Sequence, residues 1–128
     1  MAGKLVIEGD SKEVIIVACG PAGDDGVLAA KVGMAVAKAR KRRASIHVIS
    51  PLGRPDYMEV VRPVIQGNIG ITMCIRFEGE SPEDLQRLVS RLGGEGADPA
   101  VFLVGSGCEA YESLLRELGV PYESIGRR

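Results

Sequence analysis

The sequence predicts a three-layer α/β/α sandwich on a mainly parallel sheet, because short β-branched runs alternate with helical stretches from residue 13 onward. The runs are continuously apolar, as expected when helices cover both faces of the sheet. The segments between the strands, at about ten or more residues, suit right-handed helical crossovers between parallel strands. We therefore expect one domain over residues 1–128 with four to five strands, of the flavodoxin-like or Rossmann-like kind.

The expected strands are short and are bounded by turn-forming residues. They cover Val14–Ala18, Ile46–Ile49, Ile69–Phe77 and Val101–Val104, with a short fifth strand within Tyr122–Ile125. Leu5–Ile7 is expected to form one further strand, which residues 9–12 would turn back onto the first as a hairpin. Such a strand would be antiparallel to its neighbour and could not lie between two parallel strands.

The expected helices alternate with these strands. They are Val27 to about Arg43, Asp56–Gln66, a helix after Ser81, and about Cys108–Leu118. The third has the clearest boundaries, because Ser81 is a typical N-cap, Pro82 suits the first position, and Gly93 and Gly94 provide the stop. Gly119 ends the last helix.

Composition and charge exclude several classes of function. The 128 residues are 45% hydrophobic and 26% charged, which provides a core and rules out intrinsic disorder. Sixteen Lys and Arg against seventeen Asp and Glu give a net charge of −1, so no field attracts nucleic acid or anionic lipid. The sequence contains neither an apolar run of the roughly 18–20 residues that span a membrane nor a secretory signal. We expect a cytoplasmic protein that binds neither membrane nor nucleic acid.

Three cysteines, Cys19, Cys74 and Cys108, are far apart in the sequence. An odd number of cysteines in a cytoplasmic chain argues against a disulfide framework. With a single histidine and no CxxC spacing, the chain offers no recognisable set of four zinc ligands. We therefore expect no metal ion and no cofactor.

In a parallel sheet, ligands bind beyond the carboxyl ends of the strands. This rule gathers four loops at one edge: 19–26, 50–56, 78–81 and 105–108. The first, CGPAGDDG, follows a strand and precedes a helix, a place that suits phosphate, but it matches neither GxGxxG nor GxxxxGK[ST]. Capping of the helix by its two aspartates is the alternative. The candidate ligand-binding residues are Cys19, Gly20, Gly23, Asp24, Asp25, Arg54, Ser106 and Gly107.

Two further residues carry chemistry that could be catalytic. Cys108 is expected at the N-terminus of the last helix, where the helix dipole stabilises a thiolate, although Glu109 and Glu112 oppose that effect. Burial as a small apolar side chain is the alternative for Cys108. His47 is expected in mid-strand in a structural role, because no partner that would position it as a base is evident.

Three stretches of the segment Glu13–Ile75 resemble the DsrE/DsrF-like sulfur-relay family. They are EVIIVACGPAGDDGVLAAKVGMAVAKA, IHVIS and MEVVRPVIQGNIGITMC. In that family a cysteine near the end of the last of these strands can carry a persulfide. The resemblance implies that role for Cys74, which would join the carboxyl edge of the sheet only if its strand ended just after it.

These observations lead to two hypotheses about function. The first is a thiol or persulfide carrier that passes sulfur to a partner protein, with Cys74 as acceptor by resemblance or Cys108 by helix-dipole chemistry, and Arg54 as a nearby cation. The alternative is a non-catalytic module that binds a nucleotide or another small ligand, or a subunit of a larger assembly. We also expect a homo-oligomer, because the helix from Val27 is apolar over more than the roughly 100° stripe that one sheet face requires.

Overall fold

The computed structural model describes residues 13–19, 43–51, 65–67, 72–96 and 99–125. From residue 72 onward, strands and helices alternate along these segments as the sequence predicts. They are β1 (Glu13–Ala18), β2 (Arg43–Ile49), β3 (Thr72–Gly79), α3 (Pro82–Gly94), β4 (Ala100–Val104), α4 (Glu109–Leu118) and β5 (Glu123–Ile125). Among the described residues, no helix has the length and apolar character needed to cross a membrane.

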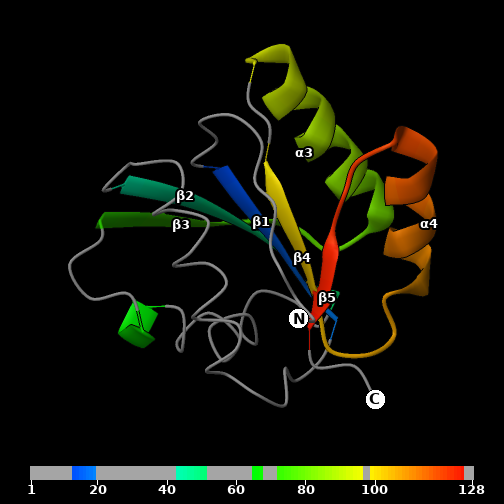
Figure 1. The fold of residues 1–128 in the computed structure, drawn as a ribbon, viewed down its shortest axis with the longest axis horizontal. Helices are drawn as coiled ribbons and strands as arrows, with labels where there is room; N and C mark the ends of the chain where they lie inside the picture. The colour runs from blue at the N-terminus through cyan, green and yellow to red at the C-terminus, as the bar shows by residue number, and fades with distance from the viewer. Residues whose placement is uncertain (1–12, 20–42, 52–64, 68–71, 97–98, 126–128) are drawn as a thin grey trace, which may run out of the picture.

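The strands form one sheet in the order β3-β2-β1-β4-β5, and every neighbouring pair is parallel (Figure 1). The predicted α/β class is therefore confirmed, and the strand order is the Rossmann-like one rather than the flavodoxin-like one. The chain builds outward from β1 through β2 to β3 and then crosses back to place β4 on the other side of β1. The topological switch point, where sheets of this class bind ligands, therefore lies between β1 and β4.

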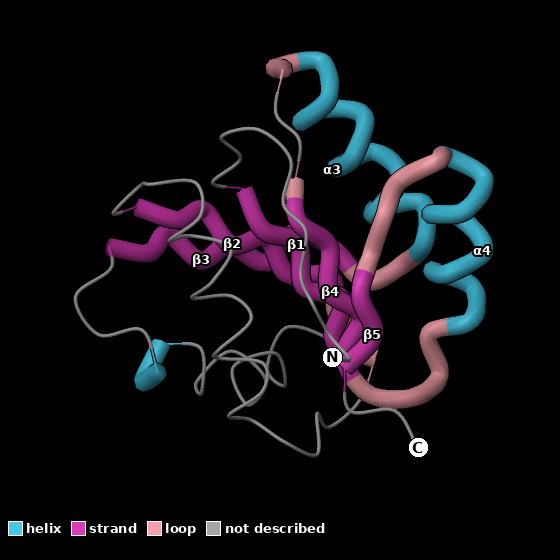
Figure 2. The backbone as a smooth tube through the Cα atoms, viewed as in Figure 1, coloured by secondary structure: helices cyan, strands magenta, loops and turns pink. Residues whose placement is uncertain are grey.

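Helices α3 and α4 cover the same face of the sheet (Figure 2). Their apolar side chains pack on alternate residues of the strands, and the core on this face consists of Ile15, Val17, Ile49, Leu85, Leu88, Leu92, Val101, Leu103, Cys108, Tyr111 and Leu115. On the opposite face, Val14, Ile16 and Phe102 are also buried. Burial on both faces explains why the central strands are continuously apolar.

Helix α3 begins as predicted. The Oγ of Ser81 accepts a hydrogen bond from the Asp84 N–H at 3.2 Å, and the Asp84 carboxylate accepts one from the Ser81 N–H at 3.2 Å. The N–H of Glu80 donates to the same carboxylate at 2.9 Å. These backbone hydrogen bonds, with that of Glu80 the strongest, hold the pKa of Asp84 below its ordinary value of 3.8. The capping box therefore fixes the start of α3 directly after β3.

Two strands extend beyond their predicted ends. Strand β2 begins at Arg43 rather than Ile46, and β3 ends at Gly79 rather than Phe77, while residues 69–71 lie outside the described ranges. Gly79, two residues beyond the predicted end of β3, still pairs with Ile49 of β2. Because β3 is an edge strand of the described sheet, polar side chains are tolerated along it.

Several predictions concern residues outside the described ranges. They are the strand Leu5–Ile7, the helix from Val27, most of the helix Asp56–Gln66, and the candidate ligand-binding residues Gly20, Gly23, Asp24, Asp25 and Arg54. All of these stay predictions.

Candidate functional site

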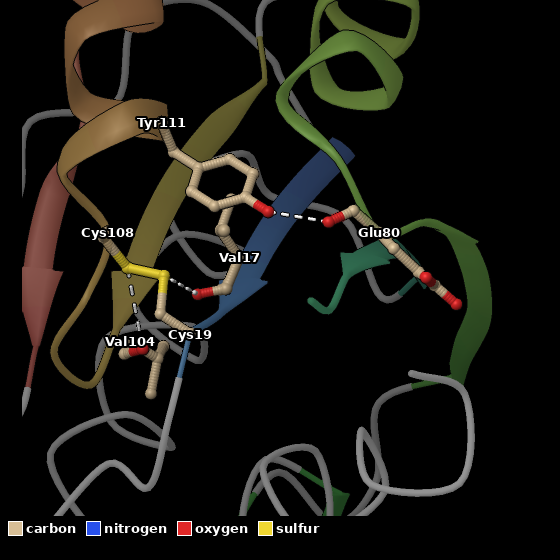
Figure 3. The surroundings of a disulfide bond; sticks show 6 residues. All are labelled: Val17, Cys19, Glu80, Val104, Cys108 and Tyr111. Atoms are coloured by element: carbon tan, nitrogen blue, oxygen red, sulfur yellow. Dashed lines mark hydrogen bonds between the residues drawn. A yellow bond between two sulfur atoms is a disulfide. The ribbon is translucent and has the colours of Figure 1, made fainter. Parts of the chain in front are cut away.

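Cys19 and Cys108 are joined by a disulfide bond at the carboxyl edge of the sheet (Figure 3). Cys19 directly follows β1, and Cys108 directly precedes α4, so the bond spans the switch point between β1 and β4. The two Cα atoms are 5.7 Å apart, a usual separation for bonded cysteines. The expectation that these cysteines form no disulfide is therefore wrong.

The backbone around the switch point brings the two cysteines together. The Cys19 N–H donates to the Val104 carbonyl at 3.0 Å, which continues the pairing of β1 with β4 by one residue. After β4, Gly105 and Gly107 adopt φ angles of +87° and +88°, a region that glycine occupies at little cost. This turn places Cys108 at the N-cap of α4. The cysteines are 89 residues apart in the sequence, so no local pattern predicts their pairing.

Each sulfur lies near a main-chain carbonyl oxygen (Figure 3). The oxygen of Val17 is 3.8 Å from Sγ of Cys19, and the oxygen of Val104 is 3.9 Å from Sγ of Cys108. When the disulfide is reduced, each thiol can donate a weak hydrogen bond to its carbonyl. After reduction, the two thiols can therefore form these hydrogen bonds in the same backbone geometry as in the disulfide form.

Tyr111 ties α4 to the loop that follows β3. Its ring belongs to the core around Cys108, and its hydroxyl donates to the Glu80 carbonyl at 2.7 Å (Figure 3). Burial raises the pKa of Tyr111, and the negative charges of Asp84, Glu83 and Glu80 raise it further. The hydroxyl therefore stays protonated at neutral pH and keeps its role as a donor.

A hollow of about 80 Å³ lies beside Cys108. It is lined by the β4–α4 turn, the first turn of α4 and one residue each of β4 and β5, namely Leu103, Gly105, Ser106, Gly107, Cys108, Glu109, Glu112 and Ser124. Only 7% of Cys108 is exposed, so the hollow marks a side from which the residue can be approached. Of the predicted candidates, the structure thus brings together Cys19, Ser106, Gly107 and Cys108.

Cys74 does not belong to this edge. It is the third residue of β3, pairs in register with Ser45, and is followed by strand residues as far as Gly79. The condition on which it would join the carboxyl edge, a strand that ends just after it, is therefore not met. Its thiol is free and exposed.

Ser50, at the carboxyl end of β2, is fully buried. Its N–H donates to the Gly79 carbonyl at 2.9 Å, but its hydroxyl has no hydrogen-bond partner among the described residues. An unpaired buried hydroxyl is uncommon in folded proteins. Because Ser50 begins the loop 50–56, this group lies at the edge where the sequence predicts ligand binding.

His47 lies in an ionic network on the face that α3 covers. Its Nδ1 is 2.6 Å from Oε2 of Glu78, and its Nε2 is 2.7 Å from Oε1 of Glu13. Both ring nitrogens thus face carboxylate oxygens, an arrangement in which a protonated imidazole donates at both ends. The network links β1, β2 and β3, and only 6% of His47 is exposed.

Arg91 of α3 completes this network with a hydrogen bond of 3.1 Å to the same Oε2 of Glu78. Burial raises the pKa of Glu78, but the hydrogen bonds and positive charges of His47 and Arg91 outweigh that effect and hold the pKa below 4.5, the ordinary value. Glu78 is therefore ionised at neutral pH. Carboxylates engage both ring nitrogens of His47, so the imidazole is not available as a general base. The network therefore has a structural role.

The sequence does not predict Glu13 and Glu78 as partners of His47. They are 34 and 31 residues away from it. One signal was present, since Cys74, Arg76 and Glu78 are polar at every second position of β3 and must point to one face. The order of the strands, which puts that face beside His47, could not be read from the sequence.

A second hollow, of about 220 Å³, lies over this network. It is lined by Glu13, Ser45, His47, Cys74, Arg76, Arg91, Leu92 and Glu95. Charges of both signs are mixed around it. In the described part of the chain, no three or more His, Cys, Asp or Glu residues are arranged to hold a metal ion.

No protein-family model, curated protein or solved structure matches this chain. Fold and site alone therefore define the class to which the protein belongs. It is a parallel α/β protein with a Rossmann-like strand order and a disulfide bond at the topological switch point.

Proposed function

We propose that this protein is a thiol-based sulfur carrier that works through Cys108 and Cys19 and alternates between a disulfide and a dithiol. The observation that carries the proposal is the disulfide bond at the switch point between β1 and β4. In parallel α/β sheets this position is the usual place for the ligand. A bond between two sulfur atoms at this position makes sulfur chemistry the activity that the geometry supports best.

Cys108 is the sulfur that exchanges with the substrate. It lines the hollow, so a small nucleophile can approach it. It also lies at the N-terminus of α4, where the helix dipole, against the opposing charges of Glu109 and Glu112, favours the Cys108 thiolate that forms when the persulfide sulfur is delivered. Cys19, which the hydrogen bond to Val104 holds at the end of β1, is the partner that closes the disulfide.

Uptake of sulfur is a single exchange step. The sulfur of a hydrosulfide ion, HS⁻, attacks Sγ of Cys108, and the bond between Cys108 and Cys19 breaks. Cys108 becomes a persulfide that keeps the hydrogen of HS⁻, and the electron pair of the broken bond leaves on Cys19 as a thiolate. The protein disulfide is the oxidant in this step, so no other is needed. In reverse, the Cys19 thiolate attacks Cys108 and releases hydrosulfide.

Delivery of sulfur is a second exchange. A thiolate of the acceptor protein attacks the outer sulfur of the Cys108 persulfide, the acceptor becomes a persulfide, and Cys108 leaves as a thiolate. The carrier is then a dithiol. A low-molecular-weight disulfide returns it to the starting state through two thiol–disulfide exchanges, in which two molecules of the small thiol are released.

The experiment is to treat the oxidised protein with sodium sulfide, block free thiols and persulfides by alkylation, and map the products by mass spectrometry. We expect one added sulfur on Cys108 and an alkylated Cys19. The variant Cys19→Ala, which cannot form the disulfide, is expected to gain no sulfur from sulfide, whereas Cys74→Ala behaves like the wild type. Added sulfur on Cys74 alone, or a disulfide that sulfide does not open, would contradict the proposal.

In this proposal Cys108 carries the persulfide, whereas the family resemblance implies that role for Cys74. It is free and exposed in β3 and forms no part of the carboxyl edge. The alternative function, binding of a nucleotide or another small ligand, depends on residues 20–26 and 52–56, which lie outside the described ranges. That alternative and the homo-oligomer stay predictions.

A further inference from the structure

We infer that the acidic rim of the hollow beside Cys108 selects the sulfur compounds that react there, favouring thiols with a positive charge and disfavouring thiols with a carboxylate. This inference rests on the proposed function and concerns its substrate class. Glu109 and Glu112 both line the hollow, and both belong to the first turn of α4. A compound that occupies the hollow beside Cys108 therefore lies near these two side chains.

The charges around the hollow have one dominant sign. Glu109 and Glu112 bring two negative charges, whereas the N-terminus of α4 is equivalent to roughly half a positive charge. No lysine or arginine is among the described residues that line the hollow. The net charge of the described residues that line the hollow is therefore negative, although the site lies at a helix N-terminus.

The two glutamates are not equivalent. Arg116 follows Glu112 by four residues on α4, so its guanidinium can reach Glu112 on the helix surface and offset that charge. Glu109 is exposed and has no basic residue four positions further along, where Ser113 stands. We therefore expect Glu109 to contribute the larger part of the selectivity.

Every thiol reacts as its thiolate, so the selectivity depends on the second charge of the compound. Cysteamine carries an ammonium group, 2-mercaptoethanol carries no second charge, and 3-mercaptopropionate carries a carboxylate. For charges several ångströms from two carboxylates in a solvated hollow at low salt, we expect the rates for cysteamine and 3-mercaptopropionate to differ about tenfold.

The experiment measures the rate at which each thiol opens the disulfide of the 128-residue protein at low ionic strength. Each rate is divided by the thiolate concentration and by the rate of the same thiol with an uncharged small disulfide, which removes differences in intrinsic nucleophilicity. The expected order is cysteamine, 2-mercaptoethanol, 3-mercaptopropionate. In 0.5 M salt the differences are expected to shrink to about twofold or less, because the screening length is then only about 4 Å.

Variants assign the effect to the rim. Glu109→Gln is expected to remove more of the tenfold ratio than Glu112→Gln, and the double variant should bring the ratio close to one. Glu117→Gln is the matched control, because Glu117 lies on the same helix but not among the lining residues, and it should leave the ratio unchanged.

The outcomes separate this inference from the proposed function. Equal normalised rates for the three thiols in the wild type, or a faster reaction with 3-mercaptopropionate, would overturn the acidic selection while the exchange chemistry stands. A ratio that persists in the double variant and in high salt would overturn it as well. If none of the three thiols opens the disulfide, the proposed function itself fails.

Discussion

Two regions on the helix-covered face of the sheet hold polar or sulfur-containing side chains by different kinds of contact. At the carboxyl edge, Cys19 and Cys108 are linked by a covalent bond beside a hollow. In the network around His47, Glu13, Glu78 and Arg91 make only ionic and hydrogen-bonded contacts. The comparison teaches that residue types alone do not identify a reactive site, since both ring nitrogens of His47 are engaged by carboxylates whereas the two cysteines are bonded to each other beside a hollow.

Reduction of the disulfide is expected to have the largest effect on stability. The bond closes a loop with a sequence separation of 89, and a loop of that length restricts the unfolded chain enough to contribute about 4 kcal/mol. Urea unfolding with and without a reductant measures the difference. The variant pair Cys19→Ala and Cys108→Ala should match the reduced protein, and neither should respond to the reductant.

Cys74→Ala is the control for this prediction. Its thiol is free, so the oxidised variant should keep the full difference between oxidised and reduced forms. A loss of that difference in Cys74→Ala would contradict the cysteine pairing.

Removal of the histidine tests the other region. His47→Leu leaves the carboxylates of Glu13 and Glu78 without the group between them, and loss of one member of a buried ionic network costs about 3 kcal/mol. Denaturant unfolding at pH 7 measures this loss. Addition of Glu78→Gln to the variant should restore part of the stability, because it removes the repulsion between the two carboxylates that the imidazole no longer separates. An unchanged midpoint in His47→Leu would show that the network contributes nothing.

The pH dependence of stability tests the charge on Glu78. Because its pKa is held below 4.5 in the folded protein, the ionised form stabilises the fold above that value, and this contribution is lost as the pH falls through the lowered pKa. Glu78→Gln is expected to cost about 2 kcal/mol at pH 7, the contribution of hydrogen bonds to a charged group. At a pH below the lowered pKa of Glu78 the two proteins should approach the same stability. A gap of constant size across this range would refute the assignment.

The smallest effect concerns the turn that positions Cys108. Gly107 has a φ of +88°, and no atom of the described residues would contact an added Cβ, so Gly107→Ala is expected to destabilise through the backbone, by about 1 kcal/mol. Gly93, within α3, also has open space around it but no positive φ, and Gly93→Ala is expected to be neutral or stabilising by up to about 1 kcal/mol. Thermal unfolding distinguishes the two, and the same sign for both variants would contradict the turn geometry.

The fold could be predicted largely from local patterns. The apolar run Val14–Ala18 predicts a strand buried on both faces, and Ser81 followed by Pro82 predicts the start of α3. The two regions compared above could not be predicted from local patterns, because each brings together residues from distant parts of the chain. The strand order that brings Cys19 to Cys108 and Glu13 to His47 is a property of the whole sheet. Cysteine connectivity, in particular, is not encoded in the spacing of the cysteines.

The most direct test of the central claim is a redox titration of the wild-type protein in thiol–disulfide buffers, with the free thiols trapped by alkylation and the peptides mapped. We expect the peptide pair linked by Cys19 and Cys108 to disappear and return reversibly as the buffer is changed, while Cys74 is alkylated throughout. A disulfide that involves Cys74, or cysteines 19 and 108 that stay unlinked under oxidising conditions, would contradict the account.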